Sequence, residues 1–208
     1  MYREDWNIAN VANLGPNFRM DVNTARIFST VALGPTGLNS GGWSTYQGGS
    51  ISGKMNSNDM IVSCQLITPP DGTLGITQSE FMCLRKPDTW STTGTAGTFF
   101  MFGQSSNGAW YIYSSVQATA TVRAQGTASG FATGDIISFG AFGTVYAAYQ
   151  NGVLIPGATF TDTGNAIASV GPTKRRWGLL TQVANSNIQG LSPDWCSSTE
   201  PNQFFMAA

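Results

Sequence analysis

The chain has 208 residues, of which 41% are hydrophobic and only 10% are charged, and its formal net charge is -1. This composition excludes an intrinsically disordered chain, because disordered chains combine few aromatic residues with a high net charge, and aromatic residues make up 12% here. The near-neutral charge argues against a nucleic-acid partner, and no apolar run approaches the roughly 18 residues of a membrane-spanning helix.

The N-terminal segment, up to about residue 55, is predicted to be rich in loops. Residues 32–53 (ALGPTGLNSGGWSTYQGGSISG) are dominated by Gly and Ser and hold Trp43 and Tyr46. We expect a long ordered loop here, because flexible linkers seldom carry large aromatic side chains. The start of the chain lacks the charged region and apolar run of a secretory signal peptide, so we expect the protein to be made in a cytoplasm and to leave it by another route.

Strand signals follow along the middle of the chain. Apolar, β-branched and aromatic residues fill five runs bounded by turn residues, namely 59–68, 79–86, 97–103, 109–116 and 118–126. Asn107-Gly108 favours a tight hairpin between the third and the fourth run. Trp110 and Ile112 alternate as residues of a buried face do, so we assign both to the core.

The clearest pattern is 134–155, GDIISFGAFGTVYAAYQNGVLI. Phe139 and Ala141 would share one face of a strand, since side chains alternate along it. Asn151-Gly152 predicts a hairpin turn into a further strand. We expect Pro156-Gly157 to end that strand, because proline cannot donate to a β-ladder.

A last strand is predicted at 175–184, where Trp177 and Leu179 alternate toward a core. Lys174-Arg175-Arg176 leads into it and is interpreted as a solvated loop. Helical periodicity is nearly absent, and strand-like runs recur about every 8–15 residues, which predicts an antiparallel β-sandwich or barrel rather than βαβ units.

The cysteine and histidine counts limit the chemistry. Cys64, Cys83 and Cys196 show no metal-binding spacing and the chain has no histidine, so we predict no zinc site and no cofactor. Cys64 and Cys83 are expected to be buried free thiols, while a bond between them stays open if their strands are neighbours. Because several aspartates stand at predicted turns, a single structural calcium ion is also left as an alternative.

The 134–155 segment resembles the concanavalin A-like lectin and glucanase sandwiches, in which Gly-Asp begins one strand and Asn-Gly turns into another. The matching positions are Gly134, Asp135, Gly143, Tyr149, Asn151 and Gly152. The resemblance implies an all-β fold, an antiparallel β-sandwich (jelly roll) of the lectin/glucanase type. We expect a single domain over 1–208, with the loop-rich segment at about 1–55 and a docking tail at about 191–208.

The N-terminal sequence EDWNIANVANLGPNF is similar to the opening of minor tail proteins of phages that infect actinobacteria. The matching positions are Asp5, Asn7, Leu14, Gly15, Asn17 and Phe18, whereas Trp6 and Ile8 depart from the pattern. This resemblance implies a virion protein that is assembled in the host cytoplasm.

The acidic residues predict that the protein is not an enzyme. Glycoside hydrolysis needs two carboxylates about 5–10 Å apart, whereas the 11 acidic residues stand mostly alone at turns. The adjacent pair Glu4-Asp5 would point to opposite faces of a strand, although acids from different strands could still converge. A His-assisted nucleophile is excluded, because the chain has no histidine.

Sugar binding without a metal uses aromatic rings together with amide and hydroxyl groups. The candidate glycan contacts are Trp43, Tyr46, Trp90, Tyr111 and Tyr113. Trp43 and Trp90 are the leading candidates, because functional aromatic residues project from loops. Each of the five could instead plug an end of the sandwich or a subunit interface.

We therefore predict a non-enzymatic virion protein, a minor tail protein that acts in host-surface glycan attachment or in tail-tip architecture. Expected partners are other virion proteins, host cell-wall glycan and further copies of the chain, with a trimer expected on a tail axis. Phe204, Phe205 and Met206 are candidate assembly residues, since an apolar terminus docks on its own core or on a neighbour. The alternatives are a carbohydrate-binding module of a cell-wall-active protein and a capsid decoration protein.

Overall fold

The computed structural model describes residues 2–5, 18–22, 26–28, 31–33, 40–46, 55–67, 73–74, 80–88, 98–104, 107–116, 119–185, 188–189 and 192–199. These segments form β-strands and two short 3-10 turns, η1 (Thr163–Asn165) and η2 (Pro172–Lys174). Within the described ranges, no helix is long and apolar enough to cross a membrane.

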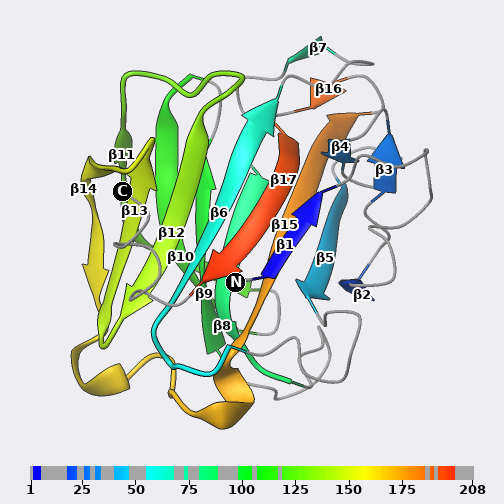
Figure 1. Cartoon of the computed structure of the whole chain (residues 1–208). Coiled ribbons are helices and arrows are strands. Elements are labelled where there is room, and N and C mark those ends of the chain that lie inside the picture. Colours follow the sequence, from blue (N-terminus) through cyan, green and yellow to red (C-terminus); the bar gives the residue numbers. More distant parts are fainter. Residues whose placement is uncertain are drawn as a thin grey trace.

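One large sheet has six strands, all joined by antiparallel pairings (Figure 1). In spatial order they are β1 (Tyr2–Asp5), β17 (Ser192–Thr199), β6 (Met60–Ile67), β12 (Ile136–Phe142), β13 (Val145–Gln150) and β14 (Val153–Thr161). The start of the predicted docking tail is thus a strand of this sheet, while residues 200–208, including Phe204, Phe205 and Met206, lie outside the described ranges.

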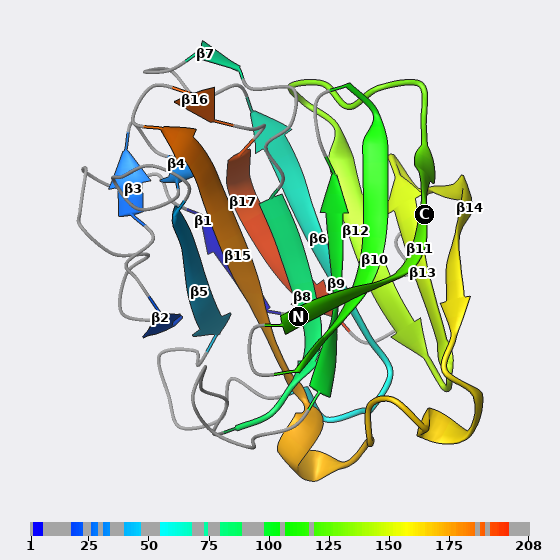
Figure 2. The ribbon, with the colours of Figure 1, turned by 180° about the vertical axis from the view of Figure 1, so that it is seen from behind.

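The other large sheet has nine strands and lies behind the first in Figure 1, so that it is in front in the view of Figure 2. Its main path is β11 (Thr119–Thr127), β10 (Ala109–Val116), β9 (Thr98–Gln104), β8 (Glu80–Lys86), β15 (Arg176–Asn185), β16 (Ile188–Gln189) and β7 (Thr73–Leu74). Off this path, β5 (Ser40–Tyr46) pairs with β15, and β2 (Phe18–Val22) pairs with β5. A separate hairpin joins β3 (Arg26–Phe28) to β4 (Val31–Leu33).

The core fills the space between the two large sheets. The residues assigned to it from the sequence are all buried, which confirms those assignments: Trp110, Ile112, Phe139, Ala141, Trp177 and Leu179. Aromatic rings join the layers, and the centroids of Phe100 on β9 and Tyr146 on β13 are 3.9 Å apart. Two sheets packed face to face confirm the predicted β-sandwich.

A buried arginine also ties the sheets together. Arg85 on β8 is 1% exposed, and it donates from Nη1 to the Tyr146 hydroxyl at 2.9 Å and from Nη2 to the Gly143 carbonyl at 2.7 Å. Its Nη2 also lies 3.6 Å from the Asp59 carboxylate. Burial raises the pKa of Tyr146 to about 12, although the neighbouring Arg85 opposes the rise.

Two predictions, one of a loop and one of a strand end, were wrong. Residues 40–46, which hold Trp43 and Tyr46, form strand β5 instead of the expected loop, because pairing with β15 and β2 satisfies their backbone groups. The strand from Val153 also continues through Pro156-Gly157 to Thr161. Proline is tolerated there because β14 is an edge strand with an irregular register against β13.

The prediction that Cys64 is a free thiol was also wrong, because Cys64 is disulfide-bonded. Cys83 is buried and free, so the two residues do not bond to each other. Their strands, β6 and β8, belong to different sheets, whereas Cys196 lies opposite Cys64 in the register of β17 and β6. The sequence could not supply this register.

The basic run is not the solvated loop that was expected. Arg175 Nε donates to Asn58 Oδ1 at 2.8 Å, and Arg176 Nε donates to Asp88 Oδ1 at 2.8 Å. Both guanidinium groups therefore fasten segments that are distant in sequence to the start of β15.

Candidate functional site

The region around the β13–β14 hairpin is organised by one carboxylate. Asp135 accepts hydrogen bonds from Asn151 Nδ2, Gln150 Nε2 and the Ala132 N–H, each at 2.8 Å. Burial by itself would raise the pKa of Asp135, but the three hydrogen bonds outweigh it and hold the pKa below its ordinary value. An ionised Asp135 therefore fixes the positions of Gln150 and Asn151.

Asn151 forms the tight turn that the sequence predicts. Its φ is 51° and that of Gly152 is 79°, the pair of positive values that a type I′ hairpin requires. Its Oδ1 accepts the Ile136 N–H at 2.9 Å, which links the turn to the start of β12. β14 leaves this turn as the edge strand of its sheet.

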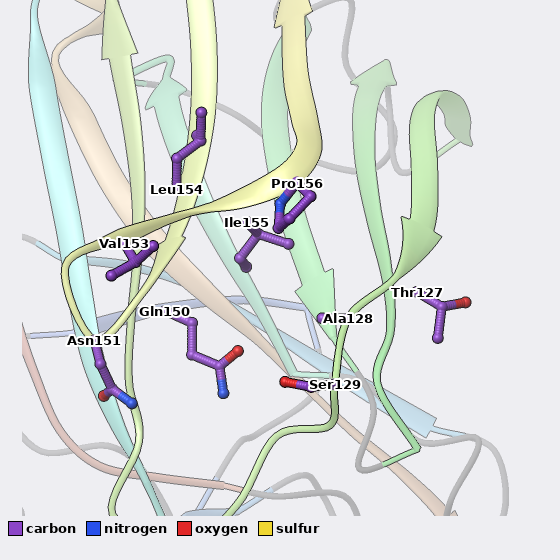
Figure 3. Close-up of a pocket in the computed structure, with 9 residues that line it drawn as sticks. All are labelled: Thr127, Ala128, Ser129, Gln150, Asn151, Val153, Leu154, Ile155 and Pro156. Carbon is purple, nitrogen blue, oxygen red and sulfur yellow. The ribbon is translucent and has the colours of Figure 1, made fainter.

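A pocket of about 490 Å³ lies between this hairpin and the segment that follows β11 (Figure 3). β11 and β14 are edge strands of different sheets and lie side by side in both views of the ribbon (Figures 1 and 2), so the pocket opens at the side of the sandwich. We call it the edge pocket, and its lining residues are Thr127, Ala128, Ser129, Gln150, Asn151, Val153, Leu154, Ile155 and Pro156.

Two polar atoms of the edge pocket are not used by any described residue. Gln150 Nε2 donates to Asp135 and, at 3.0 Å, to the Gly130 carbonyl. Both partners can only accept, so the orientation of the amide is determined and Gln150 Oε1 is left as an acceptor. The Ser129 hydroxyl likewise has no partner among the described residues. Figure 3 shows the Gln150 amide directed toward Ser129, whereas the Thr127 side chain points away from the pocket.

The other wall of the edge pocket is apolar. Val153, which is 70% exposed, and the buried Ile155 form this wall from one face of β14, whereas Leu154 between them points to the opposite face (Figure 3). A branched side chain as exposed as that of Val153 gains free energy when a ligand removes it from water. The pocket therefore combines an apolar strip with a few fixed polar groups, as ligand sites do.

Trp110 supports the edge pocket from behind. A methyl group at Gly126 of β11 would lie 2.5 Å from its Cζ2 atom, and one at Gly157 of β14 would lie 3.7 Å from the same atom. The indole ring thus fills the space between the two edge strands and needs glycine at position 126. Trp110 is 2% exposed, and its Nε1 has no hydrogen-bond partner in the described part of the chain.

A second candidate surface lies on the outer face of the nine-stranded sheet. Tyr111 and Tyr113 are both half-buried there, and their rings stack with centroids 5.5 Å apart. The register places Gln125 opposite Tyr111 and Val122 opposite Tyr113, and both β11 residues are exposed. We call these four residues the tyrosine face. Burial, with a smaller contribution from Tyr111, raises the pKa of Tyr113 above its ordinary value.

The same outer face is closed farther along the sheet. Met101 on β9 and Cys83 on β8 continue the cross-strand row of Tyr113, yet they are 1% and 0% exposed. Solvent therefore reaches this face at β10 and β11 but not at these positions on the two strands beside them. Any ligand of the tyrosine face lies along the β10–β11 side of the sheet.

Two of the predicted glycan contacts, Trp43 and Tyr111, lie in the same sheet, far apart. The register places Trp43 in one cross-strand row with Tyr111, through Leu180, Phe81 and Gly103. Four strand spacings of about 4.8 Å separate the backbones of Trp43 and Tyr111, roughly 19 Å. Tyr46 lies in the same strand as Trp43 but outside this row, and Trp90 lies outside the described residues.

Sequence reasoning missed the edge pocket. The one local signal was the apolar run at 153–155 directly after a hairpin turn, which was interpreted as an ordinary strand. Its partner, residues 127–129, lies more than twenty positions earlier in the chain. No spacing rule connects two edge strands of different sheets, so the pocket could not be predicted.

The carboxylates whose side chains the structure describes have structural partners, Asp135 as above. Asp59 and Asp88 pair with Arg85 and Arg176, and Asp162 accepts the backbone N–H groups of Ile167 and Ala168 at 2.9 Å. In the described part of the chain, no three acidic, cysteine or histidine residues gather as a metal site would require.

No protein-family model and no curated protein matches the chain. Among solved structures it is similar to the carbohydrate-binding module CBM66 from Bacillus subtilis, with a TM-score of 0.55 and 12% identity over 88% of this chain and 92% of that one. It is also similar to the exoplasmic/lumenal domain of VIP36 in its Ca²⁺/Man3GlcNAc-bound form, with a TM-score of 0.51 and 8% identity over 88% and 85% of the two chains. These likenesses confirm the lectin-type sandwich that residues 134–155 predict.

Proposed function

We propose that the protein binds carbohydrate without catalysis, as a minor tail protein of a phage virion that acts in host-surface glycan attachment or tail-tip architecture. The observation that carries the binding part is the tyrosine face. A sugar has apolar CH faces and polar hydroxyls, so it suits a surface that offers aromatic rings beside an amide. Tyr111 and Tyr113 supply the rings and hydroxyls, and Gln125 supplies the amide.

Two further observations support binding rather than hydrolysis. The carboxylates whose side chains are described are engaged in ion pairs or turn hydrogen bonds, so none of them is a free member of a catalytic pair. The fold is also similar to that of a protein whose name states carbohydrate binding, the module CBM66.

The virion assignment is supported by the N-terminal sequence. Its Asp-x-Asn and Leu-Gly-x-Asn-Phe pattern is similar to the opening of phage minor tail proteins. The low content of charged residues suits a protein that packs against other virion proteins and against copies of itself, with a trimer expected on a tail axis. Immunogold labelling and mass spectrometry of purified particles would test this; a protein absent from the particle would refute it.

Binding is tested with arrays of glycans and with isolated cell-wall polysaccharide of the host. We expect Tyr111→Ala and Tyr113→Ala each to weaken binding about tenfold, which is roughly 1.4 kcal/mol. Tyr113→Phe keeps the ring and should keep most of the affinity, and Val145→Ala, at an exposed valine of the other sheet, should keep all of it. Undiminished binding by a folded double variant, Tyr111→Ala with Tyr113→Ala, would place the glycan elsewhere.

One alternative has its own support. The likeness to a bacterial carbohydrate-binding module favours such a module attached to a cell-wall-active protein. The two readings share the tyrosine face and differ in location. Detection in bacterial cell-wall fractions without virus particles would favour the module.

A further inference from the structure

We propose that the edge pocket is a second binding site, separate from the tyrosine face, and that it takes the ring of a neutral pyranose sugar. The inference concerns residues that take no part in the proposed function of the tyrosine face. It rests on the charge, the polar atoms and the apolar wall of the pocket, and on Trp110 behind it.

The charge of the pocket selects a neutral ligand. None of the described residues that line it carries a charge. The nearby Asp135 carboxylate accepts from Asn151, Gln150 and the Ala132 N–H, so its oxygens are already occupied. A carboxylate ligand would find no cation among the lining residues, and an ammonium ligand would find no free anion, so either would lose its hydration without compensation.

The polar atoms select a ligand that carries several hydroxyls. Gln150 Oε1 accepts only, and it is held in place by the two hydrogen bonds that Gln150 Nε2 donates. The Ser129 hydroxyl can donate or accept. A ring whose neighbouring hydroxyls donate to Oε1 and exchange hydrogen bonds with Ser129 would use these atoms without any change in the protein. A purely apolar ligand would instead leave Oε1 buried and unpaired, which costs free energy.

The apolar wall accounts for the other side of the same ligand. Val153 presents exposed aliphatic surface on β14, across the pocket from the segment that holds Ser129 (Figure 3). A pyranose ring has a face of C–H groups that packs against such surface while its hydroxyls point to the polar wall. The volume of about 490 Å³ falls within the range of small-molecule sites, roughly 300–1,000 Å³.

The pocket is also built to keep its shape. Trp110 stands behind it between Gly126 and Gly157, and the Asp135 hydrogen bonds fix the turn that forms its lower end. A preformed site loses little conformational entropy on binding. The tyrosine face, in contrast, lies on the outer surface of the other sheet, so occupation of one site does not require the other.

The test is an amide NMR titration of the ¹⁵N-labelled full chain with four probes of similar size. Methyl β-glucopyranoside and methyl α-mannopyranoside are neutral, glucuronate is anionic and glucosamine is cationic. We expect the neutral probes to shift the amide signals of Ser129, Gln150 and Leu154, with weak affinity. We expect the charged probes to shift them at least about tenfold less at equal concentration.

Two variants locate the site. Ser129→Trp fills the pocket from an exposed position and should abolish the shifts, whereas Ser169→Trp places the same side chain at another exposed serine and should leave them unchanged. Tyr111→Ala should also leave them unchanged. The double variant Tyr111→Ala with Tyr113→Ala distinguishes failure of this proposal from failure of the tyrosine-face proposal. It should remove shifts of amide signals on β10 and β11 and keep those of the edge pocket, because each site has its own amide signals.

Several results would overturn the inference. One is the absence of shifts at the pocket with both neutral probes while the chain is folded. A second is stronger binding of glucuronate or glucosamine, which would refute the argument from charge. A third is shifts that survive Ser129→Trp or that lie only at β10 and β11, which would place the ligand outside the edge pocket.

Discussion

The tyrosine face and the edge pocket lie on two sides of the same strand, β11, yet they are built in different ways. The tyrosine face belongs to one sheet, and its ring pair comes from residues two positions apart on β10. The edge pocket combines residues of two sheets and is supported by a buried tryptophan and a carboxylate that fixes the adjoining turn. A surface on the outer face of one sheet can change at a small cost to the fold, whereas a site between sheets shares its supports with the core.

The largest expected difference between the two regions is in stability. Trp110→Ala should lower the free energy of unfolding by about 3–5 kcal/mol, because it leaves a cavity between β11 and β14. Tyr111→Ala, at a half-buried position, should lower it by only about 1 kcal/mol. Urea unfolding of both variants measures the contrast, with Trp110→Phe as the control that refills most of the space. Equal losses for the two alanine variants would contradict the assignment of Trp110 as the support of the pocket.

A smaller loss is expected where the indole ring touches β11. Gly126→Ala places a methyl group 2.5 Å from Trp110 Cζ2, so ring or strand must shift, at a cost of about 1–3 kcal/mol. The neighbouring Gln125→Ala, on the tyrosine face, should change stability by less than about 0.5 kcal/mol. Thermal unfolding provides the measurement, and a neutral Gly126→Ala would show that the indole ring is free to move.

Asp135→Asn should affect the edge pocket and leave the tyrosine face intact. Losing hydrogen bonds to a charged acceptor should cost about 1 kcal/mol near neutral pH. The pKa of Asp135 is lower in the folded state than in the unfolded state, so this stabilisation is complete above the unfolded pKa and is lost as the pH falls through the folded one. The free energies of unfolding of the natural chain and the variant should therefore converge as the pH falls. A difference between them that stays constant down to the lowest pH would contradict this role.

The smallest effect is expected within the tyrosine face. Burial and the neighbouring Tyr111 both raise the pKa of Tyr113, so Tyr111→Phe should move that pKa back toward its ordinary value. Because the folded pKa is the raised one, the neutral phenol stabilises the folded state below the unfolded pKa, and this contribution is lost as the pH rises through the folded value. Ultraviolet titration of the tyrosines measures the change, with Tyr149→Phe, on the other sheet, as a control that should not affect Tyr113.

Much of the fold could be predicted from local patterns. The strands around 60–67, 80–86, 98–104 and 109–116 follow from alternation and turn residues, and the Asn151-Gly152 turn follows from the φ values that only such residues adopt readily. The errors have a common cause. Residues 40–46 looked like a loop because glycine and serine are poor strand formers, but pairing on two sides outweighs that preference.

The candidate sites were predictable only in part. Tyr111 and Tyr113 were identified as aromatic residues in a predicted hairpin, whereas the closure of their face at Met101 and Cys83 depends on tertiary packing. The partner of Cys64 depended in the same way on a register between strands that are distant in sequence.

The sequence by itself determined the class of the fold, the hairpin of residues 134–155 and the alternation that selects the core, because each depends on neighbours within a few residues along the chain. The tertiary structure alone decided that β11 and β14 would be neighbouring edges, that Trp110 would stand between them, and that residues 127–129 would face residues 150–156 across a pocket. The physical reason is that the packing of one sheet on another depends on the summed burial of many side chains, and no short segment encodes that sum.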